Sequence, residues 1–295
     1  MSTVGTRADE QSLPPLQPPG DSTGLFGVFR RRYLLKLLVQ KELRVRYQAS
    51  FLGLLWSYIK PLIRFLTYLI VIGYVIGLKD LEGYPYHIFS GMIIVTAFSE
   101  TLRAGTRSVT KNKSLVRKMN VPREMFPMAS VLVTAYHVVP QFVVLLIAVW
   151  LAGWHPDGPA LVAGVLSVAI LVTFSLAVAL AFSAFNVYYR DSENFTETIA
   201  HLVTWSTPMI YTFEMIADRT NGNWIEQVYL LNPVAIAVML SQRCFWVPTL
   251  EDPATGVQPD NLQLRGVLML VACLAFVWLA QRIFSRLESG FAEHL

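Results

Sequence analysis

Long apolar stretches interrupted by blocks of positive charge constrain this chain more than any other feature. Seven lysines and arginines lie between residues 30 and 46, directly before the first apolar stretch, and seven more lie between residues 103 and 123. Basic residues that flank membrane spans stay on the cytoplasmic side. The pattern therefore predicts a chain that crosses a membrane several times, with both basic blocks in the cytoplasm.

The composition supports this interpretation. Hydrophobic residues make up 54% of the chain, charged residues 15%, and the mean hydropathy is +0.47. So little polar surface would not solvate a globule of 295 residues. The net charge of +4 is small, and its basic part lies beside the apolar stretches. We therefore expect membrane lipids and a cytoplasmic protein as partners, and no nucleic acid.

Six stretches are predicted to span the membrane, whose hydrocarbon core is about 30 Å thick. The fifth is short and carries Pro208, so we expect a kinked helix there. The predicted spans are residues 51–78, 84–102, 125–151, 160–187, 198–213 and 264–283. With six spans both termini are cytoplasmic, and 18 basic residues lie inside against four outside.

A seventh apolar stretch, residues 224–246, does not fit a span. Asn232-Pro233 divides it into two pieces of roughly ten residues, and each is too short to cross the hydrocarbon core. Seven full spans would also place Arg282 and Arg286 on the opposite side from both basic blocks. We therefore expect an external re-entrant helical hairpin between spans five and six.

The region before the first span has two predicted parts. Residues 1–24 are polar and rich in proline and glycine, which indicates a disordered cytoplasmic tail. Residues 25–50 mix arginines with apolar residues that fall on two sides of a helical wheel, which suits an amphipathic helix between the lipid and the bundle. The fold class is thus an all-α integral membrane protein whose transmembrane domain covers residues 51–295.

Several segments, taken in order, resemble one family. They are KELRVRYQASFLGLLWSYIKP at 41–61, SLVRKMNVPREMFPMASVL at 114–132, FNVYYRDSENF and TPMIYTFEMI within 185–216, LLNPVAIAV from Leu230, and FSRLESGFAEHL at the end of the chain. Together they resemble the permease subunits of ABC type-2 exporters of lipid-linked polysaccharides, the O-antigen and teichoic acid exporter family. Within it the chain is most similar to actinobacterial exporters of a lipid-linked galactan for arabinogalactan.

The resemblance implies a bacterial inner-membrane protein that exports a polyprenyl-diphosphate-linked polysaccharide. It also implies a homodimer joined to two ATPase subunits, with the conduit between the two permeases. The chain has no GxxxxGK[ST] phosphate-binding loop. We therefore expect ATP and magnesium on a separate ATPase subunit, and no cofactor and no catalytic residue on this chain.

The cytoplasmic loop 103–124 is predicted to couple the chain to that ATPase. Its short basic helix would press apolar side chains into a groove on the ATPase, while its cations meet acidic groups. The candidate residues are Leu115, Val116, Arg117, Lys118, Pro122, Arg123 and Glu124. The alternative is a solvated basic loop held against anionic lipid.

Lys60 and Arg64 are the clearest candidates for a binding site. Ionisable groups inside a span are costly and normally face a partner or an aqueous cavity. Their i,i+4 spacing puts them on one helix face, where a diphosphate headgroup would find a cationic contact. Arg44 and Arg46 are further headgroup candidates. The alternative is a structural ion pair of Lys60 or Arg64 with Glu100, Glu193 or Glu197.

Aromatic side chains are the candidates for the conduit itself. A sliding sugar polymer needs flat aromatic surfaces for its apolar ring faces. The residues chosen are Trp56, Tyr68, Trp205 and Tyr211; the alternative is that they form the aromatic belt at the membrane interface. The five histidines are scattered without ligand spacing, so no metal site is predicted.

Three rival functions remain open. A drug or small-lipid exporter of the same superfamily would have a narrow lateral cleft in place of an aromatic channel. A membrane glycosyltransferase using a polyprenyl-phosphate donor would need an external acidic pair, for which Glu251 and Asp252 are the candidates. A flippase independent of any ATPase would lack a nucleotide-binding partner.

Overall fold

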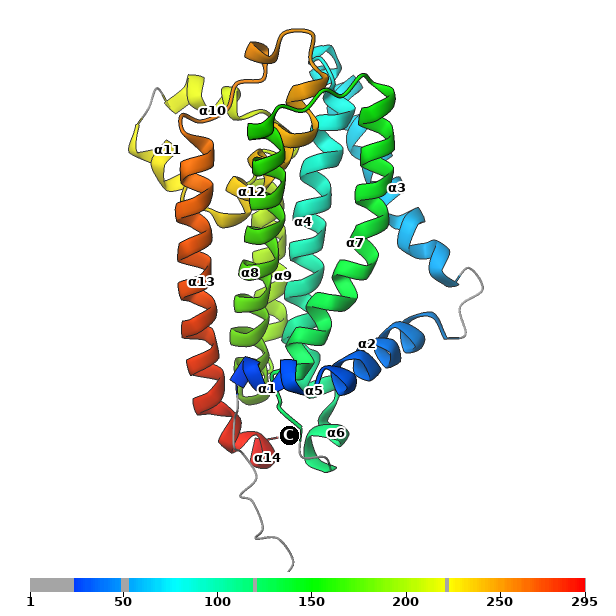
Figure 1. Ribbon diagram of the computed structural model, residues 1–295, viewed down its shortest axis with the longest axis vertical. Helices are drawn as coiled ribbons and strands as arrows, with labels where there is room; N and C mark the ends of the chain where they lie inside the picture. Colours follow the sequence, from blue (N-terminus) through cyan, green and yellow to red (C-terminus); the bar gives the residue numbers. More distant parts are fainter. Residues whose placement is uncertain (1–23, 49–52, 119–120, 221–222, 295) are drawn as a thin grey trace, which may run out of the picture.

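Helices running side by side build the molecule (Figure 1). The computed structural model describes residues 24–48, 53–118, 121–220 and 223–294, and these ranges contain no β-strand. The expected all-α fold is therefore confirmed. The larger helices are α3 (Trp56–Tyr68, continued by a π-helical segment over Leu69–Val75), α4 (Tyr84–Thr106), α7 (Met125–Leu151), α8 (Gly158–Tyr188), α9 (Ser192–Trp205), α12 (Pro233–Phe245) and α13 (Leu262–Leu287).

Shorter helices close the two ends of this bundle (Figure 1). One end carries α1 (Gly24–Arg30), α2 (Arg32–Tyr47), α5 (Ser108–Lys111), α6 (Lys113–Lys118) and α14 (Phe291–His294), and the other carries α10 (Phe213–Thr220) and α11 (Trp224–Tyr229). Single 3-10 turns lie at Gly53–Leu55, Leu78–Asp80, Val247–Thr249, Pro253–Thr255 and Glu288–Gly290.

Four segments of the described chain are long and apolar enough to cross a membrane. They are Trp56–Val75, Met125–Leu151, Gly158–Tyr188 and Leu262–Gly290. Helix α4 has 23 residues but is less apolar, and most of it is buried among other helices, where it need not match lipid. Helix α9 has only 14 residues. The count of six spans therefore stays a prediction.

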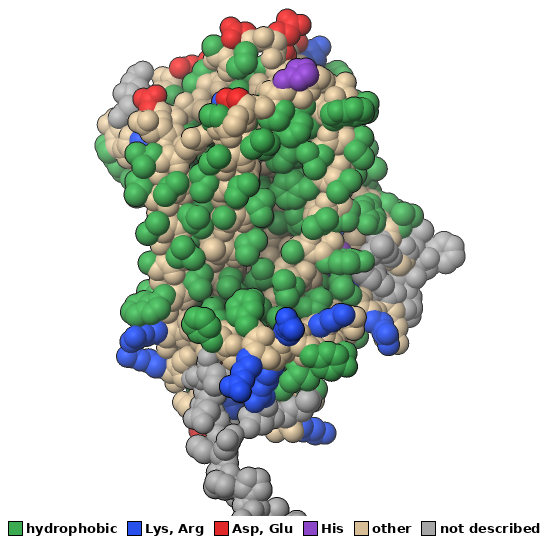
Figure 2. Space-filling model, in the orientation of Figure 1, with side chains coloured by type: hydrophobic (Ala, Val, Ile, Leu, Met, Phe, Trp, Pro, Cys, Tyr) green, Lys and Arg blue, Asp and Glu red, His purple; other side chains and the backbone are tan. Residues whose placement is uncertain are grey.

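Charge is separated between the two ends of the molecule. Figure 2 shows a broad band of hydrophobic side chains, with lysine and arginine gathered at the end where α1, α2 and α14 lie, and acidic side chains at the opposite end. An apolar band between charged ends is the surface expected of a chain solvated by lipid. Under the positive-inside rule, the basic end would be cytoplasmic; the orientation remains a prediction.

Helix α8 forms the centre of the bundle, where it packs against α4, α7, α12 and α13. Small residues allow the backbones to approach closely. A Cβ atom on Gly105 of α4 would lie 2.6 Å from Cβ of Ala179 on α8, and one on Gly164 of α8 would lie 2.6 Å from Sγ of Cys244 on α12. In lipid, such close packing replaces the hydrophobic effect as the main force between helices.

The stretch 224–246 divides at Asn232-Pro233, as the sequence predicts. The Asn232 side chain accepts hydrogen bonds from the backbone N–H groups of Val234 (3.0 Å) and Ala235 (3.4 Å), and Pro233 occupies the first turn of α12. Helix α12 then lies buried between α4, α8 and α13, whereas α11 stays at the periphery. That the stretch 224–246 enters the membrane from outside as a re-entrant hairpin remains a prediction.

The expectation of one kinked helix over residues 198–213 is wrong. Helix α9 starts earlier, at Ser192, and ends at Trp205; the chain is then non-helical until α10 begins at Phe213. Pro208 explains the end, because proline offers no N–H to the preceding turn and disfavours helical geometry at the residue before it. Beyond the helix end, the Gln242 side chain of α12 donates to the Pro208 carbonyl at 2.6 Å.

Residues 24–47 form two helices where the sequence suggested one over 25–50. They are separated at Arg31, which has φ −102° and ψ 36°. Val28 and Leu38 are buried against the bundle, while Phe26 is 88% exposed, so apolar residues do face two sides. Figure 1 shows α1 and α2 lying across the base of the long helices. Of the expected tail over residues 1–24, only Gly24 is described, and it begins α1; residues 1–23 and the end of the predicted helix at 49–50 fall outside the described residues.

Candidate functional site: a cationic cavity beside α2

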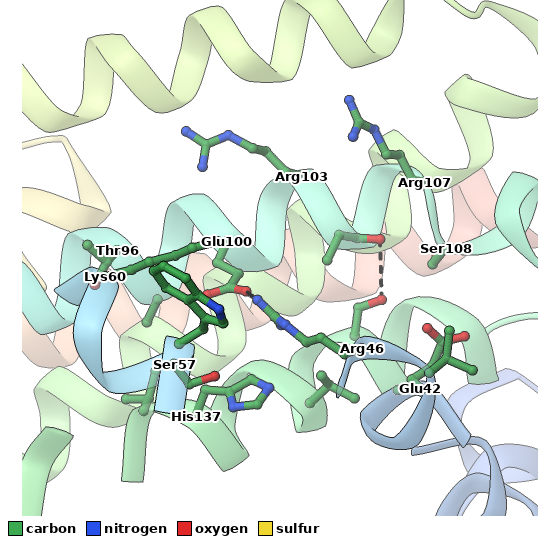
Figure 3. Close-up of a pocket in the computed structure, with 18 of the residues that line it drawn as sticks. Glu42, Arg46, Ser57, Lys60, Thr96, Glu100, Arg103, Arg107, Ser108 and His137 are labelled. Atoms are coloured by element: carbon green, nitrogen blue, oxygen red, sulfur yellow. Dashed lines mark hydrogen bonds and ion pairs between the residues drawn. The ribbon is translucent and has the colours of Figure 1, made fainter. Parts of the chain in front are cut away.

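A cavity with a volume of about 850 Å³ lies between α2, α3, α4, α5 and α7 (Figure 3). It lies toward the basic end of the bundle, where α2 crosses the base. Its charged lining consists of six cationic side chains and two carboxylates: Arg46, Lys60, Arg64, Arg103, Arg107, Lys111, Glu42 and Glu100. The excess of positive charge makes the cavity a candidate site for an anion.

Glu42 and Glu100, the two carboxylates that line the cavity, are each paired with a cation other than Lys60 or Arg64. The Arg46 guanidinium forms an ion pair with Glu100, which Figure 3 shows directly. Arg107, which directly follows the helix that carries Glu100, pairs instead with two carboxylates of α9, Glu193 at 2.7 Å and Glu197 at 3.6 Å. The alternative expectation, that Lys60 or Arg64 pairs with Glu100, Glu193 or Glu197, is therefore wrong.

Lys60 and Arg64 have no carboxylate partner among the described residues. Both line the cavity from one face of α3, and neither makes an ion pair within the part of the chain that the structure describes. The Lys60 Nζ lies 5.9 Å from the centre of the Trp56 ring. Arg103 likewise makes no ion pair with the residues that the structure describes, but it extends away from Arg46 (Figure 3). Arg44, the remaining headgroup candidate, is exposed and does not line the cavity.

A chain of polar contacts joins α2 to α5 and thereby forms one wall of the cavity. Lys111 donates to Glu42 at 2.5 Å, Asn112 donates to Glu42 at 3.3 Å, and Lys41 donates to Asn112 at 2.7 Å. Burial alone would raise the pKa of Glu42, but the hydrogen bond and charge of Lys111, aided by Asn112 and Lys41, outweigh it and lower that pKa. Glu42 is therefore held ionised and fixes α2 beside the cavity.

Helix α7 supplies a neutral polar wall. His137 and Gln141 both line the cavity, and the Gln141 amide donates to the His137 carbonyl at 3.1 Å. Pro140 lies within this helix and has no N–H to donate. The Oε1 atom of Gln141 has no hydrogen-bond partner in the described structure. This wall can therefore hydrogen-bond a polar ligand that the cations attract.

The four predicted conduit aromatics are dispersed. Trp56 lines the cavity beside Lys60. Tyr68 is half-buried and packs against the main core, Trp205 is 65% exposed, and the Tyr211 hydroxyl donates to the Trp205 carbonyl at 3.0 Å. Only Trp56 of the four touches the cavity, so an aromatic conduit within one chain is not assembled by these residues.

The predicted coupling residues differ in accessibility. Arg117 and Lys118 are exposed on α6, with Leu115 and Pro122 half-buried nearby. Val116 is buried in this chain's own core, and Glu124 is fully buried and accepts from Gln281 at 2.8 Å. Arg123 donates to the Glu288 carbonyl and lies 5.7 Å from the Phe291 ring. The buried members of the set therefore anchor the segment to α13 and the C-terminus, and the exposed cations face outward.

Sequence reasoning found part of the cationic cavity and missed the rest. Arg103, Arg107 and Lys111 were counted only as members of a basic block, and His137 only as one scattered histidine. Their i,i+4 spacing, Arg103 to Arg107 to Lys111, was a signal that they share one side of the chain as it runs from α4 into α5. Nothing in the sequence indicated that α2 and α7 would bring Glu42 and His137 to the same cavity.

Together, the apolar band, the charged ends and a cationic cavity at the margin of the bundle are features of a polytopic membrane transport protein. Residues 33–246 match the family described as "ABC-2 type transporter". Because this stretch exceeds half of the chain, the chain belongs to that family, whose members are membrane subunits that work with an ATPase partner. The chain is accordingly a transport subunit and not an enzyme.

Curated relatives match over nearly their whole length. The chain is 27% identical over 270 residues to the O-antigen export system permease protein RfbA of Myxococcus xanthus, covering 91% of this chain and 97% of the relative. It is 27% identical over 263 residues to the protein of the same name from Klebsiella pneumoniae, covering 89% and 95%. It is 24% identical over 253 residues to the polysialic acid transport protein KpsM of Escherichia coli, covering 85% and 92%.

Proposed function

We propose that this chain is the permease subunit of an ATP-driven exporter that moves a polyprenyl-diphosphate-linked polysaccharide out across the inner membrane. The single observation that carries the proposal is the cavity in which Lys60 and Arg64 lack an anionic partner among the described residues. Two uncompensated cations inside an apolar segment are costly unless a ligand neutralises them. A diphosphate does so with several acceptor oxygens at once.

The names of the relatives point to the class of cargo. O-antigen and polysialic acid are both polysaccharides, and the similarity to their transport proteins extends over 85% or more of this chain. We propose a galactan destined for arabinogalactan as the particular cargo, on the strength of the sequence resemblance alone. The polymer would enter head first, with its diphosphate at the cavity and its sugars following.

Assembly would require a second copy and two ATPase subunits. Helix α3 and its π-helical continuation bury almost nothing within one chain, and a second copy would cover this face so that the conduit aromatics, Trp56, Tyr68, Trp205 and Tyr211, line the space between the two. The exposed Arg117 and Lys118 on α6 would meet acidic groups of the ATPase. Both termini would then be cytoplasmic, at the basic end of the bundle.

Depletion of the protein in its native host, followed by analysis of lipid-linked glycans on each membrane face, tests this function. We expect a long polyprenyl-diphosphate glycan to accumulate on the cytoplasmic face, and its sugars identify the cargo. If the lipid pool is unchanged, or if glycan synthesis stops at a short product, the exporter proposal is wrong. An unchanged pool would favour a drug or small-lipid exporter, and a truncated product would favour a transferase.

A further inference from the structure

A second hollow lies at the edge of the bundle, far along the chain from the cationic cavity. It is a groove of about 490 Å³ between one face of α13 and the turn that joins α11 to α12, with Phe174 of α8 at its base. Figure 1 shows α13 at the margin of the bundle, with α11 beside the end of α13 that lies opposite α14. The groove therefore faces the surroundings of the bundle and not its interior.

The α13 wall of the groove has strict helical periodicity. It is formed by Arg265, Leu268, Met269, Ala272, Cys273 and Phe276. From Arg265 to Phe276 the helix rises about 16 Å. One leaflet of a hydrocarbon core about 30 Å thick has about the same depth. The groove thus runs the length of a single leaflet along a helix that is itself a candidate membrane span.

Arg265 lies at the end of the groove nearest the start of α13, where the helix would leave the hydrocarbon. Its Nε donates to the Asp260 carbonyl at 3.1 Å and its guanidinium donates to the Gln227 side-chain oxygen at 3.3 Å. Both acceptors are neutral, and no carboxylate pairs with Arg265 in the described parts of the chain. The groove therefore combines an apolar floor with one uncompensated positive charge at its interfacial end.

We propose that this groove is a binding site for an anionic phospholipid of the leaflet at the α11 end of the bundle. An acyl chain lies along Leu268, Met269 and Phe276, and the phosphate of the headgroup meets Arg265. Charge complementarity selects an anionic lipid over a zwitterionic one, because Arg265 has no carboxylate to neutralise it. The groove does not suit the sugar polymer, since Arg265 is its only charged lining residue and its floor is apolar. The site is independent of the proposed cargo.

The test measures lipids retained by the full-length chain purified with its ATPase partner. The complex is equilibrated in detergent with equal amounts of phosphatidylglycerol and phosphatidylcholine, and bound lipid is counted by native mass spectrometry. We expect the unmodified protein to retain phosphatidylglycerol preferentially. Arg265→Gln should reduce that preference about fivefold, and Arg219→Gln, an exposed arginine of α10 at the same end, should leave it unchanged.

Leu268→Trp provides a second variant that leaves the charge intact. Leu268 is 61% exposed, so the larger side chain fills the groove with little effect on folding, which an unchanged elution volume verifies. We expect this variant to lose bound phosphatidylglycerol as well. Equal retention of the two lipids by the unmodified protein, equal effects of Arg265→Gln and Arg219→Gln, retention by Leu268→Trp, or an isoprenoid as the retained lipid would each overturn the proposal.

Discussion

Helix α3 together with its π-helical continuation (Trp56–Val75) and helix α8 are both apolar segments long enough to cross a membrane, yet they have opposite surroundings. Half of the most apolar window of α8 is buried inside the bundle, whereas the corresponding window of α3 is 6% buried. The more buried window is also the more apolar, since its mean hydropathy is 2.6 for α8 and 1.4 for α3. Helix α8 is held by other helices of the same chain, and α3 must be held by lipid or by another molecule.

The difference between the two helices explains where charge is tolerated. Lys60 and Arg64 lie on α3, which belongs to the least buried of the four candidate spans in the described chain. Helix α3 bounds an open cationic cavity together with α2, α4, α5 and α7. Helix α8 carries no lysine, arginine or acidic residue between Gly158 and Tyr188. The helix packing that holds the chain together is thus centred on α8, and the side chains proposed to bind an anion lie beside α3, at the margin of the bundle.

The largest contrast should come from one substitution made in both helices. Ile170 of α8 is 1% exposed and Ile63 of α3 is 56% exposed. Ile170→Ala leaves a cavity in a packed core and should lower the free energy of unfolding by about 2–4 kcal/mol. Ile63→Ala should change it by less than about 0.5 kcal/mol. Thermal unfolding of each variant in detergent measures both values; similar losses would contradict the distinction between the two helices.

The next largest effect should fall on anion binding. Lys60→Gln and Arg64→Gln each remove a charge-assisted contact, so we expect each to weaken pyrophosphate binding about tenfold without changing thermal stability. Arg44→Gln is the matched control, because Arg44 is basic and nearby but does not line the cavity. Isothermal titration of the purified protein gives these affinities. A tenfold loss for Arg44→Gln, or none for Arg64→Gln, would show that the cavity is not the anion site.

Substitution of Glu100 should strengthen anion binding, whereas substitution of Lys60 or Arg64 should weaken it. Its carboxylate neutralises Arg46 at the cavity, so Glu100→Gln frees one more cation and should strengthen pyrophosphate binding by up to about fivefold. Glu214→Gln, at the far end of the bundle in α10, should have no effect. The same titration measures both variants. Weaker binding by the Glu100→Gln variant would mean that Glu100 positions Arg46 for the anion instead of competing with it.

The smallest effect concerns the attachment of α2. Because the pKa of Glu42 is lower in the folded chain than its ordinary value of 4.5, its contribution is complete above that pH and is lost as the pH falls below it. Since Lys111 is well exposed, the pair should contribute only about 0.5 kcal/mol. Spin labels on α2 and α7 should report α2 moving away at low pH, and Glu42→Gln should show the same displacement at neutral pH. A distance between α2 and α7 that Glu42→Gln leaves unchanged would show that Glu42 does not hold α2 in place.

Much of the helical architecture was predictable from the sequence because each helix carries its own local signals. Residues 125–151 were predicted as a span and form α7 with those same bounds. Asn232-Pro233 marked the start of α12, since an asparagine cap followed by proline is a local signal. The end of α9 before Pro208 was missed, because proline allows a helix either to bend or to stop. The non-helical chain is held by contacts that the local sequence does not show, such as the hydrogen bond from Gln242 of a distant helix to the Pro208 carbonyl.

The candidate site was predictable only where a single residue is unusual for its place in the sequence. Lys60 and Arg64 stand out as charges within an apolar run. The pairing of Arg46 with Glu100 joins residues 54 positions apart, and that of Glu42 with Lys111 joins residues 69 positions apart. Several glutamates were available to each cation, and only the packing of α2 across the base selects among them. The groove on α13 escaped prediction because Arg265 lies near a helix end, where a basic residue needs no special explanation.

Site-specific photo-crosslinking tests the central claim most directly. A photoreactive residue is placed at Thr96, which lines the cavity, or at Ile63, which is exposed on α3 and does not line it. Membranes that contain the lipid-linked glycan are then irradiated without ATP. We expect the diphosphate end of the glycan lipid to crosslink to position 96, and we expect Arg64→Gln to reduce the yield of this product about tenfold. Crosslinking at position 63 alone, or an undiminished product at position 96 in the Arg64→Gln variant, would contradict the claim that the cationic cavity receives the headgroup.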